Sequence, residues 1–240
     1  MATRYWVGGA GTWDASTTTH WSASSGGAGG ASVPTSADDV VFNASSGTGV
    51  VTMSGASLSC GSLTCTGYTG TLSYSGSTAC QLSVYGSLTL AAGMTFTVGN
   101  NISQYIIFQG AVTGRTLTTA GKTMPSLVIN TGAGVTLQDN VTQISSSEFL
   151  VYSALDLNSK TIVASTLDLK SNANVTGGTA AITTTTFTAN ALSTFTLGST
   201  TITAQDFNGG GLTYGTVQFF GTSLLRGISG VNTFGNLVLG

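Results

Sequence analysis

The chain has 240 residues, of which only 6% are charged, and its formal net charge is −2. Its six basic residues are scattered, which argues against nucleic acid as a partner because phosphate neutralisation needs clustered Lys and Arg. No stretch approaches the 18 consecutive apolar residues of a membrane-spanning helix, and no apolar signal-peptide segment follows Arg4. We therefore expect no membrane span and a chain that folds in a cytoplasm.

Residues 1–45 differ from the rest of the chain. They contain all three tryptophans, Trp6, Trp13 and Trp21, and the only histidine, His20, between glycine-rich segments. Aromatic rings among glycines suit a compact unit in which the rings bury large areas and the turns stay tight. A stack of β coils needs such a unit at its end, because the first coil otherwise presents an open edge. We predict that residues 1–45 form an N-terminal cap or attachment segment.

The end of this segment reads as a turn followed by a strand. Pro34 favours the turn, Asp38 and Asp39 can accept hydrogen bonds from free backbone amides, and residues 40–42 are rich in β-formers. The two aspartates could instead contribute to a calcium site, but calcium takes six to eight oxygens and no patterned set of carboxylates follows. We expect neither a metal site nor a cofactor.

From residue 46 to residue 240 the chain is repetitive. Apolar residues recur in pairs, and Gly, Asn or Ser separates the pairs at roughly eight- to ten-residue intervals. Alternation with a period of two predicts strands with one face inward, and no segment favours a helix. A sandwich, a barrel and a solenoid are compatible, and recurrence without a terminating pattern favours a β-solenoid over residues 46–240, continuing past Gly240. The pairs include Leu82 and Val84, Leu88 and Leu90, Ile106 and Phe108, Leu127 and Ile129, Leu167 and Leu169, Phe195 and Leu197, Leu212 and Tyr214, and Leu237 and Leu239.

Two threonine-rich segments, residues 182–188 and 200–203, fit the same architecture. An outward threonine ladder is compatible with strands and can form hydrogen bonds along the stack. The same hydroxyl groups offer an alternative role in binding a polysaccharide.

The cysteines are Cys60, Cys65 and Cys80, an odd number in a chain that is large enough to fold without disulfides. Cys60 and Cys65 lack the spacing and the partner histidine of a zinc site. We expect all three to be small core or turn residues.

Candidate catalytic groups are sparse. Asp156 and Asp168 would stack as neighbours if one coil lay between them, with Lys160 and Lys170 nearby, but solvated ion pairs explain these charges better. His20 has no acid and nucleophile at a recognisable spacing. We predict no catalytic residue and a protein that is not an enzyme, with a polysaccharide lyase or hydrolase as the alternative.

Several short motifs resemble glycine-rich β-helical virion proteins of tailed bacteriophages, of the tail-fibre or appendage type. The resemblance covers the whole chain but is specific only in the first 45 residues. It implies a right-handed β-helix, often trimeric, whose N-terminal segment attaches to other virion proteins while distal parts meet the host surface. The motifs are Arg4-Tyr5-Trp6-Val7-Gly8-Gly9, Gly11-Thr12-Trp13-Asp14, His20-Trp21-Ser22, Val33-Pro34-Thr35, Asp38-Asp39-Val40-Val41-Phe42 and Gly211-Leu212-Thr213-Tyr214.

The sequence thus predicts a non-enzymatic virion structural protein, a tail fibre or appendage, assembled in the host cytoplasm and located in the virion. Its expected partners are other virion proteins, further copies of itself with a homotrimer favoured, and a host surface glycan. The alternative is a carbohydrate-binding or polysaccharide-depolymerising β-helix surface protein. The candidate cap or attachment residues are Tyr5, Trp6, Trp13, Trp21, Pro34, Asp38 and Asp39.

Overall fold

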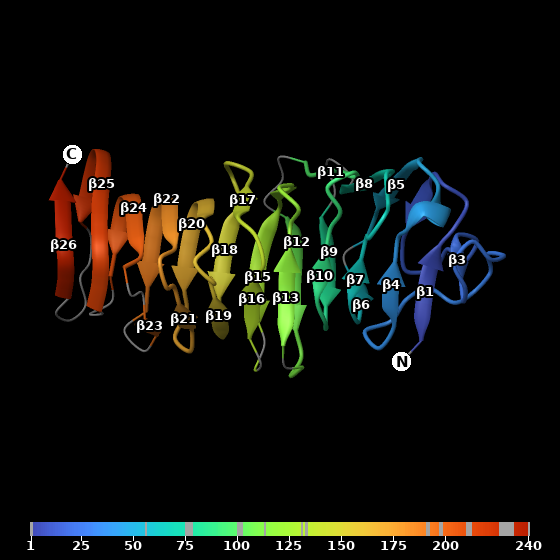
Figure 1. The fold of residues 1–240 in the computed structure, drawn as a ribbon, viewed down its shortest axis with the longest axis horizontal. Helices are drawn as coiled ribbons and strands as arrows, with labels where there is room; N and C mark the ends of the chain where they lie inside the picture. Colours follow the sequence, from blue (N-terminus) through green and yellow to red (C-terminus); the bar gives the residue numbers. More distant parts are fainter. Residues whose placement is uncertain are drawn as a thin grey trace.

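The computed structural model is an elongated stack of strands with the two termini at opposite ends (Figure 1). It is 50% strand and 2% helix, which confirms the all-β prediction. Within the described residues the helical part is a single 3-10 turn, η1 (Ala44–Ser46). The structure describes residues 2–55, 57–74, 79–99, 103–112, 114–130, 132, 134–190, 193–196, 199–209, 213–225 and 233–239. Leu197, Arg226, Gly240 and the first half of the 211–214 motif lie outside these residues.

The strands form three sheets, here called A, B and C, each of which runs along the stack. Sheet A contains, in spatial order, β3 (Trp21–Ser22), β1 (Thr3–Trp6), β4 (Asp39–Val41), β7 (Leu63–Thr64), β10 (Leu88–Thr89), β13 (Arg115–Thr118), β16 (Val135–Leu137), β19 (Ala154–Asp156), β21 (Asn174–Thr176) and β23 (Thr194–Thr196). Sheet B contains β2 (Gly11–Trp13), β5 (Val50–Met53), β8 (Thr71–Tyr74) and β11 (Thr95–Thr97). Sheet C contains β6 (Leu58–Cys60), β9 (Cys80–Val84), β12 (Gln104–Gln109), β15 (Ser126–Asn130), β18 (Glu148–Val151), β20 (Ile162–Leu169), β22 (Ala181–Ala189), β24 (Thr201–Asn208), β25 (Thr213–Leu225) and β26 (Thr233–Leu239), with β14 (Thr123–Met124) and β17 (Val141–Gln143) attached at its side.

The chain winds from sheet to sheet and returns beside its own previous coil. It forms a β-solenoid of about 7 turns, as predicted, and the right hand of the coil stays a prediction. Neighbouring coils pair in parallel: Val40 N donates to Ser62 O at 2.8 Å, and Leu63 N donates to Ser87 O at 2.9 Å. Each coil therefore satisfies the backbone groups of the next.

In sheet A, the step from one coil to the next becomes constant from β13 onward. In sheet A, Thr136 pairs with Asp156 and Asp156 pairs with Thr176, a constant step of 20 residues. In the preceding coil, β17 and β18 are two separate strands. From β20 onward one long strand takes the place of both, since the start of β20 pairs with β17 and its end pairs with β18. Earlier coils are longer and unequal, which explains the irregular spacing of the sequence pattern.

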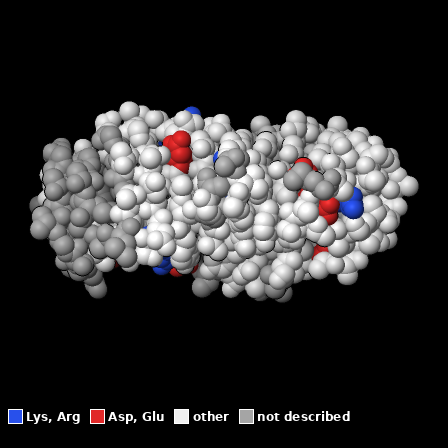
Figure 2. Space-filling view, turned by 90° about the horizontal axis from the view of Figure 1, so that it is seen from below, with Lys and Arg blue, Asp and Glu red and all other residues white. Residues whose placement is uncertain are grey.

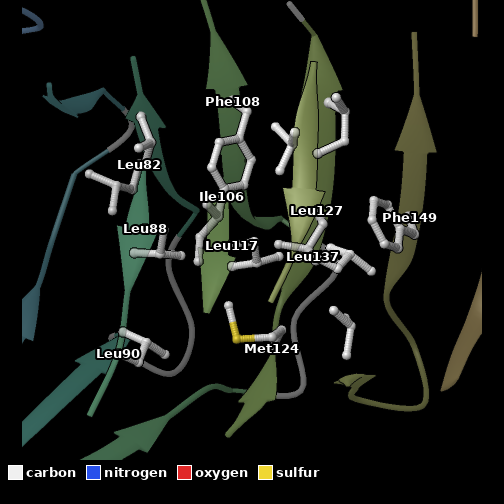
Figure 3. Packing of buried hydrophobic residues seen from close by; sticks show 14 of the residues in the cluster. Leu82, Leu88, Leu90, Ile106, Phe108, Leu117, Met124, Leu127, Leu137 and Phe149 are labelled. Carbon is white, nitrogen blue, oxygen red and sulfur yellow. The ribbon is translucent and has the colours of Figure 1, made fainter. Parts of the chain in front are cut away.

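The core is one continuous cluster that extends from Trp6 to Phe207. In Figure 3 the inward residues of sheet A, such as Leu88 and Leu117, face those of sheet C, such as Ile106 and Leu127. All four are at most 1% exposed. Burying a side chain of this size contributes about 1.5–3 kcal/mol, so the repeated inward columns supply much of the driving force for stacking.

Not every predicted inward position is covered. Leu237 lies in register with Val217, which pairs in turn with the fully buried Ile202, yet Leu237 is 42% exposed. Leu237 is uncovered in the described structure because β26 is the last strand in the order of sheet C. An inward-pointing residue is fully buried only where a neighbouring coil stacks on each side of its own coil.

The threonine segments are only partly outward. Thr183 and Thr185 are exposed, but Thr184 is buried and its hydroxyl donates to the Ser165 and Thr186 carbonyls, both at 2.9 Å. Thr200 is also fully buried. The outward threonine ladder is therefore confined to alternate positions, because strand alternation turns every second threonine inward.

Candidate functional site

The N-terminal cap is the first coil of the solenoid with an added edge strand. β1 pairs in parallel with β4, and β2 pairs in parallel with β5. The intervening residues carry β3 back onto the free side of β1, where it pairs antiparallel and places Trp6 opposite Trp21. The core continues through residue 45 without a break, so the cap and the solenoid share one interior.

The three tryptophans fill the inside of this cap. Trp6, Trp13 and Trp21 are at most 1% exposed. Trp21 packs edge-on against Trp6 and Trp13 with ring centroids 5.1 and 5.3 Å apart, and Phe42 extends the cluster. The Trp6 indole also donates to the Gly9 carbonyl at 2.7 Å. These rings shape the cap, and they leave no ring surface for a docking partner.

His20 belongs to the same structural cluster. Its ring stacks on Trp6 with centroids 4.8 Å apart, and its Nδ1 lies 2.9 Å from the Val7 carbonyl oxygen. A Cβ at Gly11 would lie 2.6 Å from the His20 ring, so the glycine allows this close approach. His20 therefore covers the tryptophan cluster.

The remaining cap candidates divide between surface and interior. Tyr5 is half-buried on β1 between Ser22 and Val41, and Pro34 is buried. Beside them, Arg4 donates through Nη2 to Ser32 Oγ at 2.8 Å on an exposed part of the cap. Tyr5 and Arg4 thus offer partner-accessible side chains in this region.

Asp38 and Asp39 close the turn through backbone amides, as the sequence predicted. Asp38 accepts from the amides of Thr35 at 3.1 Å and Ala2 at 3.2 Å, and Asp39 accepts from the Ser62 amide at 2.7 Å. Burial alone would raise the pKa of Asp38, but hydrogen bonds from Thr35 and Ala2, with the charge of Arg4, lower it below its ordinary value. Within the described residues, no group of three His, Cys, Asp or Glu side chains could hold a metal ion.

The suggested stacking of Asp156 and Asp168 is wrong. Asp156 lies in sheet A between Thr136 and Thr176, whereas Asp168 lies in sheet C between Leu150 and Thr188. One coil takes 20 residues here, so a separation of twelve residues moves the chain from one sheet to another. Asp156 instead accepts from the Thr176 hydroxyl at 3.2 Å.

Asp168 forms an ion pair with Lys170, as the sequence favoured. The hydrogen bond to Asp168 raises the pKa of Lys170 above its ordinary value. Lys170 Nζ also lies 6.0 Å from the centroid of the Tyr152 ring. The two opposite charges offset each other on the outer face of sheet C.

A groove of about 430 Å³ lies on the outer face of sheet C, over β9, β12, β15 and β18, which lie side by side in Figure 1. Its floor is an apolar column in strict register, in which Ile107 pairs with Val128 and Val128 pairs with Leu150. Tyr105 and Tyr152 also line it, together with three side-chain amides. The amides belong to Gln81, Gln109 and Asn130.

No charged side chain lines this groove. Figure 2 shows the same scarcity of charge on the face it draws, where few charged groups interrupt an uncharged surface. Gln109 is held by a hydrogen bond from its Nε2 to Ser83 Oγ at 3.0 Å. Burial, and secondarily the charge of Glu148, raise the pKa of Tyr105, which keeps this phenol neutral. The groove can therefore offer ring faces and neutral groups that both donate and accept.

Sequence reasoning did not single out these groove residues. The pair Ile106 and Phe108 does imply that Tyr105, Ile107 and Gln109 point outward. The sequence alone does not show which outward residues of other coils lie beside them, because that depends on the register of strand pairing between coils.

Comparison with known proteins finds no matching family model, curated protein or solved structure. In the described residues no helix is long and apolar enough to cross a bilayer. The structural conclusion at this point is a capped β-solenoid with a neutral groove on sheet C.

Proposed function

We propose that this chain is a non-enzymatic structural protein of a bacteriophage particle, a tail fibre or appendage anchored through its N-terminal cap. The observation that carries the proposal is the single core that extends from Trp6 to Phe207 along an elongated stack (Figure 1). The resemblance of residues 1–45 to phage appendage proteins supports the assignment to a virion.

The parallel strand pairing between successive coils supports a role as a stiff spacer. Sheets A and C run along the stack as parallel ladders, and coils contact mainly their neighbours. Bending such a stack opens ladder hydrogen bonds on one side and compresses the core on the other. A stiff connector holds its two ends at a fixed separation, which is what an appendage between a particle and a cell surface requires.

The low charge supports an assembled state. Only 6% of residues are charged, so little electrostatic repulsion opposes contact between copies or with other virion proteins. Within the proposal the protein is a homotrimer located in the virion. The outer surface of the cap, where Arg4 and Tyr5 are accessible, contacts the particle, and the buried tryptophans hold that surface in shape.

No catalytic role is part of the proposal. The pair of carboxylates that could have served a polysaccharide hydrolase, Asp156 and Asp168, lies on different sheets. Asp168 is moreover paired with Lys170. A binding role for carbohydrate is favoured by a different observation, the groove on sheet C, and is developed below.

The test is incorporation into particles. Phage particles assembled with the wild-type chain should contain it by mass spectrometry, with its cap against other virion proteins in cryo-electron microscopy maps. Arg4→Glu should reduce incorporation, because it reverses charge on the proposed contact surface. Lys122→Glu, an equal charge change far along the solenoid, should leave incorporation unchanged. Absence of the wild-type chain from particles would contradict the proposal. Equal incorporation of both variants would contradict the proposed contact surface.

A further inference from the structure

We propose that the groove on sheet C binds a neutral, hydroxyl-rich polymer, namely an uncharged polysaccharide segment. The inference goes beyond the virion assignment and does not depend on it, since it rests on the chemistry of the outer face of β9, β12, β15 and β18.

The layout of the groove fits an extended chain. Ile107, Val128 and Leu150 follow one another on successive coils, spaced by the strand separation of about 4.8 Å, and so form a narrow apolar strip. Tyr105 lies on β12 and Tyr152 directly follows β18, so the two rings flank the strip from different coils. An elongated ligand that lies along the stack would meet both rings.

The polar groups select for hydroxyls. Gln81, Gln109 and Asn130 each carry one acceptor oxygen and a donor NH₂ group, which matches hydroxyls that both donate and accept. Tyrosine rings add flat apolar faces for the C–H faces of sugar rings at low entropic cost. The hydrogen bond from Gln109 to Ser83 fixes one amide before any ligand binds.

Charge selects against ionic polymers. The groove itself has no charged side chain, and of the charges beside it Lys170 is paired with Asp168 while Glu148 is acidic. An anionic polysaccharide would meet no free cation in the groove and a carboxylate at its edge. A neutral chain desolvates no charged group of the groove, and its hydroxyls can replace the hydrogen bonds that the amides make to water.

A second copy of the chain is a poorer occupant. A partner copy would have to present a contiguous apolar surface to this shallow groove. The large apolar side chains that are exposed in the described structure, among them Val50, Val112 and Val163, are scattered over separate parts of the surface. They form no single apolar patch that a second copy could place on the groove.

Affinity electrophoresis of the purified chain tests the proposal. Native gels would contain dextran, galactomannan or xyloglucan as neutral probes, and alginate or polygalacturonate as anionic probes. We expect at least one neutral probe to retard the wild type. Tyr152→Ala and Asn130→Ala should each weaken binding about tenfold, the effect typical of losing a central contact. Tyr5→Ala, a matched tyrosine change in the cap, should leave retardation unchanged.

Both groove side chains are exposed, so their variants should keep the wild-type circular dichroism and melting temperature. Four outcomes would overturn the inference: no retardation by any neutral probe, retardation by anionic probes alone, unchanged binding by both groove variants, or a wild-type dimer that Tyr152→Ala dissociates. None of them bears on particle incorporation, so the two proposals fail separately.

Discussion

Replacing Phe187 by alanine should loosen the C-terminal coils while leaving the N-terminal coils intact. Phe187 is fully buried on β22, and its ring stacks on that of Phe207 in the next coil with centroids 5.0 Å apart. Removing a buried phenylalanine side chain costs about 3–5 kcal/mol through lost transfer free energy and the cavity left behind. In a solenoid this loss falls on the altered coil and its neighbours, because coils contact mainly the coils beside them.

Hydrogen exchange followed by mass spectrometry measures this locally. Amides of β20, β22 and β24 should exchange roughly a hundred to a few thousand times faster in Phe187→Ala, which is the rate equivalent of that free energy. Amides of β5 and β8 should keep their wild-type rates. Thr185→Ala, an exposed change on the same strand, is the control. Equal acceleration along the whole chain would refute the reasoning, since it would mean that the solenoid opens only as one unit.

Three further predictions concern the cap and the thiols. Because hydrogen bonds hold the pKa of Asp38 below its ordinary value, its carboxylate stabilises the fold at neutral pH and ceases to do so as the pH falls through the lowered pKa. The melting temperature of wild type should therefore drop more steeply in acid than that of Asp38→Asn, and parallel curves would argue against this. Gly29→Ala should destabilise the protein by about 1–3 kcal/mol in denaturant titrations, because its Cβ would lie 1.9 Å from the Thr19 carbonyl oxygen, whereas Gly132→Ala, with nothing within 4 Å, should not destabilise it. Burial raises the pKa of Cys65 to about 12 and of Cys80 to about 11, so Ellman's reagent at pH 8 should label neither thiol until the protein unfolds, and rapid labelling of the native chain would contradict their burial.

The fold class could be predicted because alternation is a local signal. Pairs such as Ile106 and Phe108 indicate which side chains point inward, and no other part of the chain is needed for this prediction. The amide-binding role of Asp38 and Asp39 was equally readable, since turn aspartates act on nearby backbone. The cysteines were also correctly expected to be small core residues, as all three are buried and free.

The arrangement of coils could not be predicted, because coil length varies. Thr3 pairs with Asp39 across a long excursion, whereas Thr136 pairs with Asp156 after only 20 residues. Without that register, Asp156 and Asp168 resembled neighbours. For the same reason Tyr105 and Tyr152, which line one groove although 47 residues of sequence separate them, gave no common signal.

The constant 20-residue step has a consequence for how the length of the protein can change. Because Thr136, Asp156 and Thr176 occupy equivalent positions, removing residues 157–176 would join the chain at matching points of two coils. The stack would shorten by about 4.8 Å, one strand separation, with every remaining side chain still on its original face. Deleting 19 or 21 residues would instead leave one coil a residue too long or too short, and a turn would have to absorb the difference, as in the earlier coils, where Leu63 and Leu88 are paired and buried although 25 residues apart. In this part of the chain, insertion, deletion or duplication of a whole 20-residue coil therefore preserves the core.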